Sequence, residues 1–181
     1  MMETTRTGTV QLVEATRDDI PLVEDLARFY LYDMARQIGP QEDWVANATW
    51  RCERMDLSYA WNEGNHPFLI EVDGNTAGFC LIDRYRLVLG VDWNMSEFYV
   101  SGPWAGRGVG RRAAEAAFDR FTGCWQVVQY PQNRAAVLFW RRVIETYSGG
   151  AFTERLIPDP DGDGVQLNVM TFAVSDTKPR S

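Results

Sequence analysis

The sequence predicts an α/β fold of the mixed α+β kind, in which helices cover both faces of a mostly antiparallel central sheet. Three observations lead to this class: period-two hydrophobic alternation near both ends of the chain, helical periodicity between them, and a central succession of strand, loop, helix, strand and helix. At 181 residues and 45% hydrophobic content, the chain can bury one core. We therefore expect a single domain over 1–181, with a core at about 9–174 and a disordered tail at 175–181.

The N-terminal elements follow from their hydrophobic periodicity. Residues 9–15 alternate as a first strand. Thr16 or Asp18 then caps a helix that the Gly-Pro pair at 39–40 ends, and residues 41–65 continue in an irregular helical pattern rich in aromatic and acidic residues. The apolar stripe of the first helix consists of Leu22, Val23, Leu26, Ala27, Tyr30 and Met34.

Two hairpins are predicted from alternation and turn residues. Their strands lie at 67–72 with 76–83, and at 151–157 with 165–174. The first turn contains Asp73-Gly74, a dipeptide typical of tight hairpin turns. The second turn, P-D-P-D-G-D-G, is acidic but lacks the ligand spacing and closing Glu of an EF-hand. We therefore expect a solvated hairpin tip there and no metal site.

The most informative stretch runs from Glu97 to Gly110, E-F-Y-V-S-G-P-W-A-G-R-G-V-G. A short apolar strand enters a glycine-rich loop, and a helix is predicted over 111–121. The free N–H groups and the positive end of the helix dipole at such a junction suit an anionic ligand. Because glycines also serve ordinary turns, this interpretation depends on the elements that follow: a strand at 125–130 and a second helix after Asn133.

This glycine run is distinct from a dinucleotide-binding fingerprint. It lies late in the chain, after antiparallel hairpins, and Gln126 to Gln129 stand where the acidic residue of such a fingerprint is expected. A Rossmann fold is therefore not predicted.

Composition excludes several classes of function. A net charge of −7 argues against nucleic acid and anionic membranes as partners and favours cationic small molecules. Cys52, Cys80, Cys124 and a single histidine, His66, support neither a disulfide framework nor a zinc site, so we expect small buried cysteines and a histidine in a loop. With no apolar run of 18 residues and no apolar N-terminal segment, a soluble cytoplasmic protein is expected.

The central stretch resembles the GNAT superfamily of N-acetyltransferases. The family motif is V-x-x-x-x-(Q/R)-x-x-G-x-(G/A), followed by a strand and an N-x-x-A-x-x-(L/F)-Y helix. Here the motif positions are Val100, Ala105, Gly108, Gly110, Asn133, Ala136, Phe139 and Trp140. Compatible secondary structure extends the resemblance over most of the chain. It implies a GNAT-like sheet, acetyl-CoA as cofactor and acetyl transfer to an amine, and it leaves a homodimer open.

The resemblance places the cofactor on the motif strand, the loop and the last helix. The strand backbone would bond the pantetheine arm and the thioester carbonyl, and Asn133 would cap the last helix and bond the pantetheine amides. The cofactor-binding residues implied are Phe98, Tyr99, Val100, Ala105, Gly106, Arg107, Gly108, Val109, Gly110, Arg111, Asn133 and Phe139. Ala105 departs from the usual Gln or Arg, and Arg107 and Arg111 can supply that charge.

Two further arginines, Arg141 and Arg142, offer alternatives on the last helix. Either they reach the cofactor phosphates, or they form surface ion pairs with Glu145.

Acetyl transfer also requires a group that takes the proton of the amine. An alkyl amine has a pKa of about 10, so presenting it neutral at pH 7 costs on the order of 4 kcal/mol. Glu97 is the best-placed carboxylate for this role, directly or through a water; the alternative is a salt-bridged Glu at a strand end.

The general acid is less well defined. Trp140 stands where many family members have the tyrosine that protonates the thiolate, and an indole cannot replace it. Tyr99 and Tyr147 are the remaining candidates, and we select Tyr147 as the catalytic acid. Alternatively the thiolate leaves unassisted, since a thiol pKa is about 8.5.

The acceptor site is expected, as in the family, between the first two helices and the last hairpin. Its candidate residues are Tyr30, Asp33, Trp44, Trp50 and Asp56. Aromatic faces stack on sugars and attract cations, although tryptophans also fill cores. The expected substrate is an aminoglycoside-type amino sugar such as kasugamycin, with antibiotic resistance as the role. The alternatives are a protein, peptide or polyamine acetyltransferase, and an acetyl-CoA-binding module without turnover.

Overall fold

The structure is a computed structural model that describes residues 8–38, 55–160, 162 and 164–175. The elements follow one another in the predicted order, except that the predicted helical segment at 41–65 is described only from residue 55 and contains there only a short 3₁₀ helix. They are β1 (Val10–Glu14), η1 (Arg17–Asp19), α1 (Ile20–Ile38), η2 (Ser58–Trp61), β2 (His66–Val72), β3 (Asn75–Asp83), β4 (Trp93–Val100), η3 (Gly102–Trp104), α2 (Val109–Phe118), β5 (Gly123–Gln129), α3 (Arg134–Ser148), β6 (Phe152–Pro158) and β7 (Gln166–Val174).

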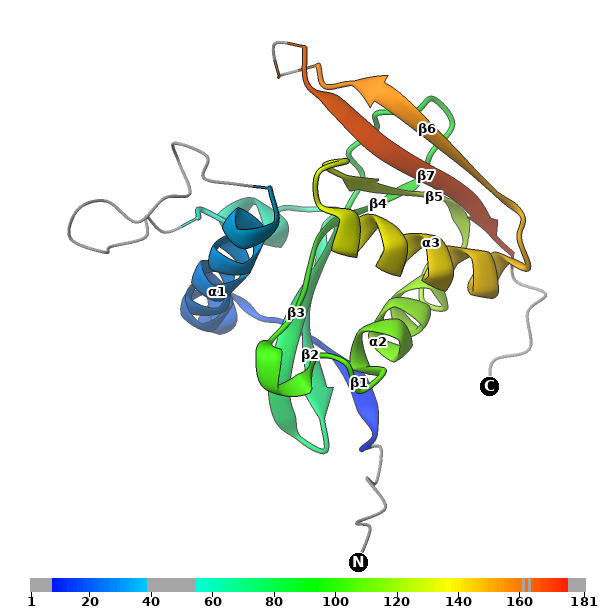
Figure 1. The fold of residues 1–181 in the computed structure, drawn as a ribbon. Helices are drawn as coiled ribbons and strands as arrows, with labels where there is room; N and C mark the ends of the chain where they lie inside the picture. Colours follow the sequence, from blue (N-terminus) through cyan, green and yellow to red (C-terminus); the bar gives the residue numbers. More distant parts are fainter. Residues whose placement is uncertain (1–7, 39–54, 161, 163, 176–181) are drawn as a thin grey trace, which may run out of the picture.

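The strands form one seven-stranded sheet in the order β1-β2-β3-β4-β5-β7-β6. Every neighbouring pair is antiparallel except β4 and β5, which are parallel. Helix α1 covers one face of the sheet, and α2 and α3 cover the other (Figure 1). The predicted mixed sheet with helices on both faces is therefore confirmed.

Strands β4 and β5 separate after a short contact. Their register consists of Trp93 with Trp125, Asn94 with Gln126, and Met95 with Val127. In Figure 1, the strands β1 to β3 and the strands β5 to β7 diverge on either side of β4. Beyond Met95, the edge of β4 that faces β5 has no strand partner among the described residues. Its backbone N–H and C=O groups are therefore available to a ligand, because such groups require hydrogen-bond partners.

A β-bulge interrupts β4 at the point where it leaves β5. On β3, Ile82 pairs with Met95 and the preceding Leu81 pairs with Glu97, so Ser96 is an extra residue on β4. Met95 contacts the core under α2 and α3, whereas Leu81 lies in the core under α1. The bulge therefore brings Glu97 to the face that α1 covers.

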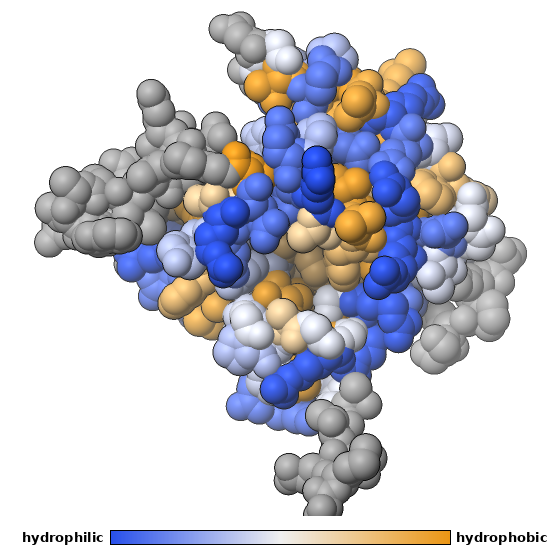
Figure 2. All heavy atoms as spheres, in the orientation of Figure 1, coloured by the Kyte–Doolittle hydropathy of each residue, from blue (hydrophilic) through white to orange (hydrophobic). Residues whose placement is uncertain are grey.

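Two hydrophobic clusters fill the two faces. The larger one joins β-strand residues to α2 and α3 around Phe118, Trp125 and Trp140. The smaller one joins the sheet to α1 and η2 around Val23, Leu57 and Phe79. Figure 2 shows apolar residues gathered in the middle of the face seen in Figure 1, between hydrophilic residues on both sides. No helix within the described residues is long and apolar enough to cross a membrane.

Local features agree with the sequence in several places. The first hairpin turn has Asp73 at φ 49° and Gly74 at φ 78°, as a tight turn requires. Helix α2 begins and ends slightly earlier than predicted, because Gly108 adopts a left-handed conformation as its N-cap. Cys80 is buried as expected, whereas Cys124 is partly exposed. Cys52, the Gly-Pro pair at 39–40 and the tail from 176 lie outside the described residues.

His66 corrects one expectation. It begins β2 rather than lying in a loop, and its ring packs 4.6 Å from that of Phe121, with Trp93 close by at 5.6 Å. These ring contacts hold His66 in the sheet, so β2 begins one residue before Pro67. Burial and nearby Arg84 lower the pKa of His66, which favours the neutral ring.

Candidate active site

The glycine loop presents unpaired backbone amides at the start of α2. Gly106 and Gly108 have φ angles of 74° and 73°, and no atom would lie within 4 Å of a Cβ on either residue. The N–H of Arg112 is the first in the helix with a backbone acceptor, the carbonyl of Gly108 at 3.2 Å. The amides before it belong to the first turn, where helix geometry leaves N–H groups without partners. This end of α2 therefore suits an anion.

Gly110 holds the loop against α3. A Cβ at this position would lie 3.3 Å from the ring of Phe139 and 3.7 Å from a methyl group of Val100. Phe139 in turn stacks on Phe98, with ring centroids 6.0 Å apart, and packs edge-on to Trp140. The predicted cofactor-binding residues Phe98, Val100, Gly110 and Phe139 therefore lie together on the face covered by α2 and α3.

The arginines around the loop have different partners. Arg111 forms an ion pair with Glu115, with Nη1 3.0 Å from Oε1, and Arg112 donates to the carbonyl of Gly8 at 2.6 Å. Arg107, between the two left-handed glycines, is exposed. Of the two cations predicted to replace the side chain missing at Ala105, Arg111 is thus partly neutralised and Arg107 is the better placed.

Asn133 is confirmed as the N-cap of α3. Its Oδ1 accepts a hydrogen bond from the N–H of Ala136 at 3.1 Å. Farther along this helix, Arg141 makes two hydrogen bonds to Glu154 of β6, at 2.8 and 2.6 Å. The predicted partner of Arg141 was Glu145 or a phosphate. The difference arises because β6 runs alongside α3 and carries its own carboxylate.

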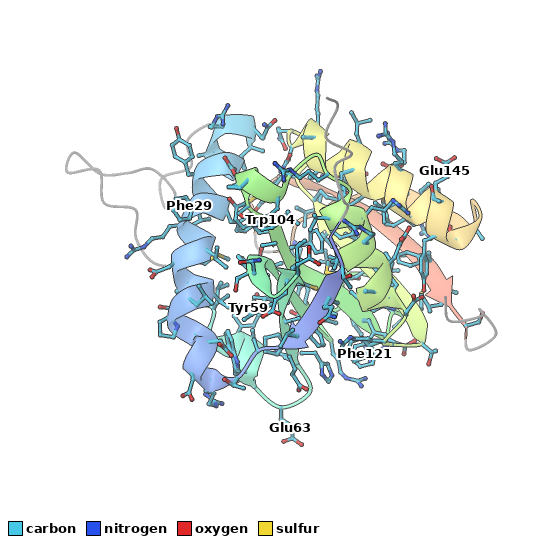
Figure 3. All side chains as sticks on the ribbon, turned by 90° about the horizontal axis from the view of Figure 1, so that it is seen from below. Phe29, Tyr59, Glu63, Trp104, Phe121 and Glu145 are labelled. Carbon is cyan, nitrogen blue, oxygen red and sulfur yellow. The ribbon has the colours of Figure 1, made fainter. Side chains whose placement is uncertain are left out.

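Glu97 lies in a group of hydroxyls on the face covered by α1. Burial raises the pKa of Glu97 to about 7; the hydroxyl of Tyr30 hydrogen-bonds the carboxyl and lowers it, and Asp83 raises it. Beside it, the hydroxyl of Tyr59 lies 2.9 Å from Oγ of Ser96. Figure 3 shows Tyr59 between α1 and the sheet. A carboxyl group with a pKa near 7 is suited to accept a proton at neutral pH.

Asp33 and Tyr99 extend this group along α1. The Tyr99 hydroxyl donates to Oδ2 of Asp33 at 3.2 Å, and its ring packs 5.8 Å from that of Tyr30. Tyr99 therefore faces the side opposite Phe98 and Val100, so its predicted contribution to the cofactor site is limited to its backbone. The predicted acceptor residues Tyr30 and Asp33 are brought together with Glu97.

The remaining acceptor candidates are not part of this group. Trp44 and Trp50 lie outside the described residues. Asp56 is exposed and accepts a hydrogen bond from the N–H of Ser58 at 2.9 Å. Hydrogen bonds from Ser58 lower the pKa of Asp56, so this carboxylate serves the local turn.

The position of Tyr147 does not fit the role of general acid that was selected for it. Its hydroxyl donates to Oδ1 of Asp119 at 2.6 Å, and its ring packs on Phe118 and Phe172 on the face opposite Glu97. Burial and the carboxylate of Asp119 raise its pKa well above the usual value for tyrosine. The sheet separates Tyr147 from Glu97, which argues against its selection as general acid.

Analysis of the sequence did not identify Tyr59, Ser96 and Tyr130 as residues of the site. Tyr130 follows β5, and burial, followed by the charges of Asp159 and Glu97, raises its pKa. Alternation through the preceding strand could have identified Tyr130, because it continues the face that carries Gln126. The bulge at Ser96 has no comparable sequence pattern.

Comparison with known proteins identifies the family. Residues 29–144 match the acetyltransferase (GNAT) family, and this range is more than half of the chain. The chain belongs to the acetyltransferase (GNAT) family. No curated protein sequence matches this GNAT protein.

Solved structures support the fold of this GNAT protein. An acetyltransferase from Thermus thermophilus matches with a TM-score of 0.61 and 20% identity, over 92% of this chain and 97% of the other. YncA of Salmonella typhimurium, solved with its cofactor acetyl-CoA, matches with a TM-score of 0.59 and 16% identity, over 96% and 98%. The ribosomal-protein-S18-alanine N-acetyltransferase of Escherichia coli matches with a TM-score of 0.56 and 16% identity, over 96% and 99%.

Acetyl-CoA is the cofactor of the GNAT family, and the residues of this chain fit it. The open glycine loop and the first turn of α2 offer amides for phosphate oxygens. The unpaired edge of β4 offers backbone groups for the amides of a pantetheine arm. On β5, Nε2 of the buried Gln129 has no hydrogen-bond partner within the described structure.

Proposed function

We propose that this protein is an acetyl-CoA-dependent N-acetyltransferase of small cationic amines, with Glu97 as the general base. The observation that carries the proposal is the position of Glu97. Its carboxyl lies beside the bulge of β4, where β4 leaves β5, and its pKa is raised to about 7. Acetyl-CoA, when bound, would supply the activated acetyl thioester that the neutral amine attacks.

Glu97 removes a proton from the ammonium group of the acceptor. With its pKa raised to about 7, the carboxylate is a stronger base than an ordinary glutamate and is still largely ionised at slightly alkaline pH. Tyr30 fixes the carboxyl by a hydrogen bond from α1. The bulge turns this side chain toward α1, so proton removal takes place on the side where the acceptor enters.

No side chain is assigned as general acid in this proposal. Trp140 carries no suitable proton, and Tyr147 is bonded to Asp119 on the other face. Departure of the thiolate without a protein acid is chemically reasonable, since a thiol pKa of about 8.5 makes it a good leaving group.

The surroundings of Glu97 favour a cationic acceptor. Asp33 supplies a carboxylate next to Tyr99, and the rings of Tyr30 and Tyr99 supply aromatic faces. Carboxylates and aromatic faces both attract ammonium groups, and the net charge of −7 acts in the same direction. An aminoglycoside-type amino sugar such as kasugamycin is the substrate we put first, with antibiotic resistance in the cytoplasm as the role.

A panel of acceptors tests this proposal. Thiol release from acetyl-CoA is measured with kasugamycin, other aminoglycosides, polyamines and peptide amines, with wild-type protein and with Glu97→Gln. Turnover of an amino sugar that Glu97→Gln abolishes is the expected result. Turnover only with peptide amines would replace the substrate class by a protein acceptor, the activity of the Escherichia coli structural neighbour.

Two departures from the family pattern favour a second candidate, an acetyl-CoA-binding module without turnover. Ala105 and Trp140 replace a phosphate ligand and the usual acid. Binding of acetyl-CoA without thiol release across the whole panel would support this second candidate against the first.

A further inference from the structure

We propose that the side-chain amide of Gln129 donates a hydrogen bond to a carbonyl oxygen of the pantetheine arm of coenzyme A. A chain of hydrogen bonds from Arg141 through Glu154 and Asn168 fixes the direction of this donor. The inference rests on the proposed function, because it requires that the protein binds coenzyme A. It assigns a binding role to a residue outside the family motif.

The chain begins with an ion pair. Arg141 donates to both carboxylate oxygens of Glu154. Hydrogen bonds from Arg141 lower the pKa of Glu154, so the group is ionised at neutral pH and can only accept hydrogen bonds. The neighbouring group of Asn168, 3.0 Å from Oε1 of Glu154, must therefore be its NH₂. The ion pair thus settles the orientation of the Asn168 amide.

The same NH₂ group settles the orientation of Gln129. Nδ2 of Asn168 lies 3.1 Å from Oε1 of Gln129 and uses its second proton there. The reverse orientation of Gln129 would place two NH₂ groups against each other. Oε1 therefore points to Asn168, and Nε2 points away from it with both of its protons available.

An unpaired amide in this position is costly. Gln129 is only 6% exposed, and Nε2 has no hydrogen-bond partner within the described structure. A buried donor without a partner destabilises a protein, so such groups normally pair with the protein, an ordered water or a ligand. The rest of the side chain is held firmly, which makes the donor rigid as well as unpaired.

The position of Gln129 indicates the ligand. It is the last residue of β5, two residues beyond Val127, where the pairing with β4 ends. Along β5 its side chain alternates with that of Val128 and lies on the face of Val127, under α2 and α3. The unpaired edge of β4, the glycine loop and Asn133 belong to this same side of the molecule. A pantetheine arm there offers amide carbonyls, which are acceptors.

Gln126, on the same strand, provides a matched contrast. It is also fully buried, but it faces the other way and all its groups are paired. Its Oε1 accepts from the N–H groups of Leu87 and Val88, and its Nε2 donates to Tyr85 and Asn94. The two glutamines share residue type, strand and burial, and differ in whether the amide is satisfied.

Calorimetric binding of coenzyme A and ADP tests the inference on the full chain. ADP shares the diphosphate with coenzyme A but lacks the pantetheine arm. Gln129→Met, which keeps the shape of the side chain, is expected to bind coenzyme A about tenfold more weakly and ADP unchanged. Its Tm is expected to change little, because the variant removes the unpaired Nε2 but leaves the second proton of the buried Asn168 amide without its acceptor. Gln126→Met is expected to lower Tm without changing the affinity for coenzyme A.

Each other outcome has a defined meaning. Wild-type affinity for coenzyme A in Gln129→Met would overturn the inference. An equal loss of coenzyme A and ADP binding together with a lower Tm would also overturn it, because that pattern indicates a structural role for Gln129. Absence of coenzyme A binding by the wild-type protein would instead overturn the proposed function, and the inference with it.

Discussion

The hydroxyl of Tyr30 on α1 hydrogen-bonds the carboxyl of Glu97 on β4 and opposes the effect of burial on its pKa. Tyr30→Phe removes this bond, so the pKa of Glu97 should rise above its present value of about 7. The acidic limb of kcat/KM should then move to higher pH, as measured by a pH series with a good acceptor. Tyr32→Phe, an exposed neighbour on α1, is the control. A limb that stays in place would contradict the geometry assigned to Tyr30.

Replacing Glu97 removes the base itself. Glu97→Gln should lower kcat/KM by about 10²–10⁴-fold and abolish the limb near pH 7, because general-base catalysis contributes that amount. Affinity for coenzyme A should not change, which calorimetry checks. Glu63→Gln is the control, since Glu63 projects away from the molecule in Figure 3. Full activity of Glu97→Gln would remove Glu97 from the mechanism.

The raised pKa of Glu97 also predicts a stability effect. The folded carboxyl titrates at about 7 and the unfolded one near 4.5, so the folded state binds more protons between these values. Stability should fall by on the order of 3 kcal/mol as pH rises through this window. Glu97→Gln should remove that part of the fall, so the variant should gain stability relative to wild type from pH 4 to pH 8. Urea unfolding at both pH values measures the difference.

The left-handed glycine at the start of α2 predicts a binding effect. Gly108→Ala should cost about 1–2 kcal/mol, because a Cβ is unfavourable in this conformation. Relief of that strain would turn the amides of the loop, so the affinity for coenzyme A should fall at least fivefold. Gly90→Ala is the matched control, since Gly90 has φ 86° and equally open surroundings. It should lose similar stability and keep its affinity in the same calorimetric titration.

Tyr147 should be dispensable for catalysis. Tyr147→Phe removes the hydrogen bond to Asp119 and should lower the free energy of unfolding by about 1 kcal/mol. kcat and its pH dependence should remain those of the wild type, because the sheet lies between Tyr147 and Glu97. A large loss of kcat would restore Tyr147 as the general acid.

Features set by neighbouring residues in the chain were predictable from the sequence. The Asp73-Gly74 turn, the glycine loop and the Asn133 cap each depend on residues close together in the chain. These local rules predicted most of the strands and helices, and the family resemblance predicted acetyl-CoA as the cofactor.

Features that join distant segments were not predictable. The bulge at Ser96 depends on how β3 pairs with β4, and no local pattern specifies it. The orientation of Gln129 depends on three partners from α3, β6 and β7. Tyr147 was selected as one of the two tyrosines that remain once Trp140 is excluded, and its partner Asp119 belongs to the end of another helix.

The extra residue at Ser96 determines which face of the sheet each side chain of β4 points to. Side chains alternate along a strand, so the number of residues between Met95 and Phe98 decides which of them face the same way. Deleting Ser96 would restore even alternation and leave Glu97 on the side of α1 and Phe98 on the side of α2 and α3, because the bulge already accommodates the extra residue. A β4 strand that kept Ser96 but lost the bulge would instead turn Glu97 toward α2 and α3 and Phe98 toward α1, so the bulge assigns the roles of the two faces.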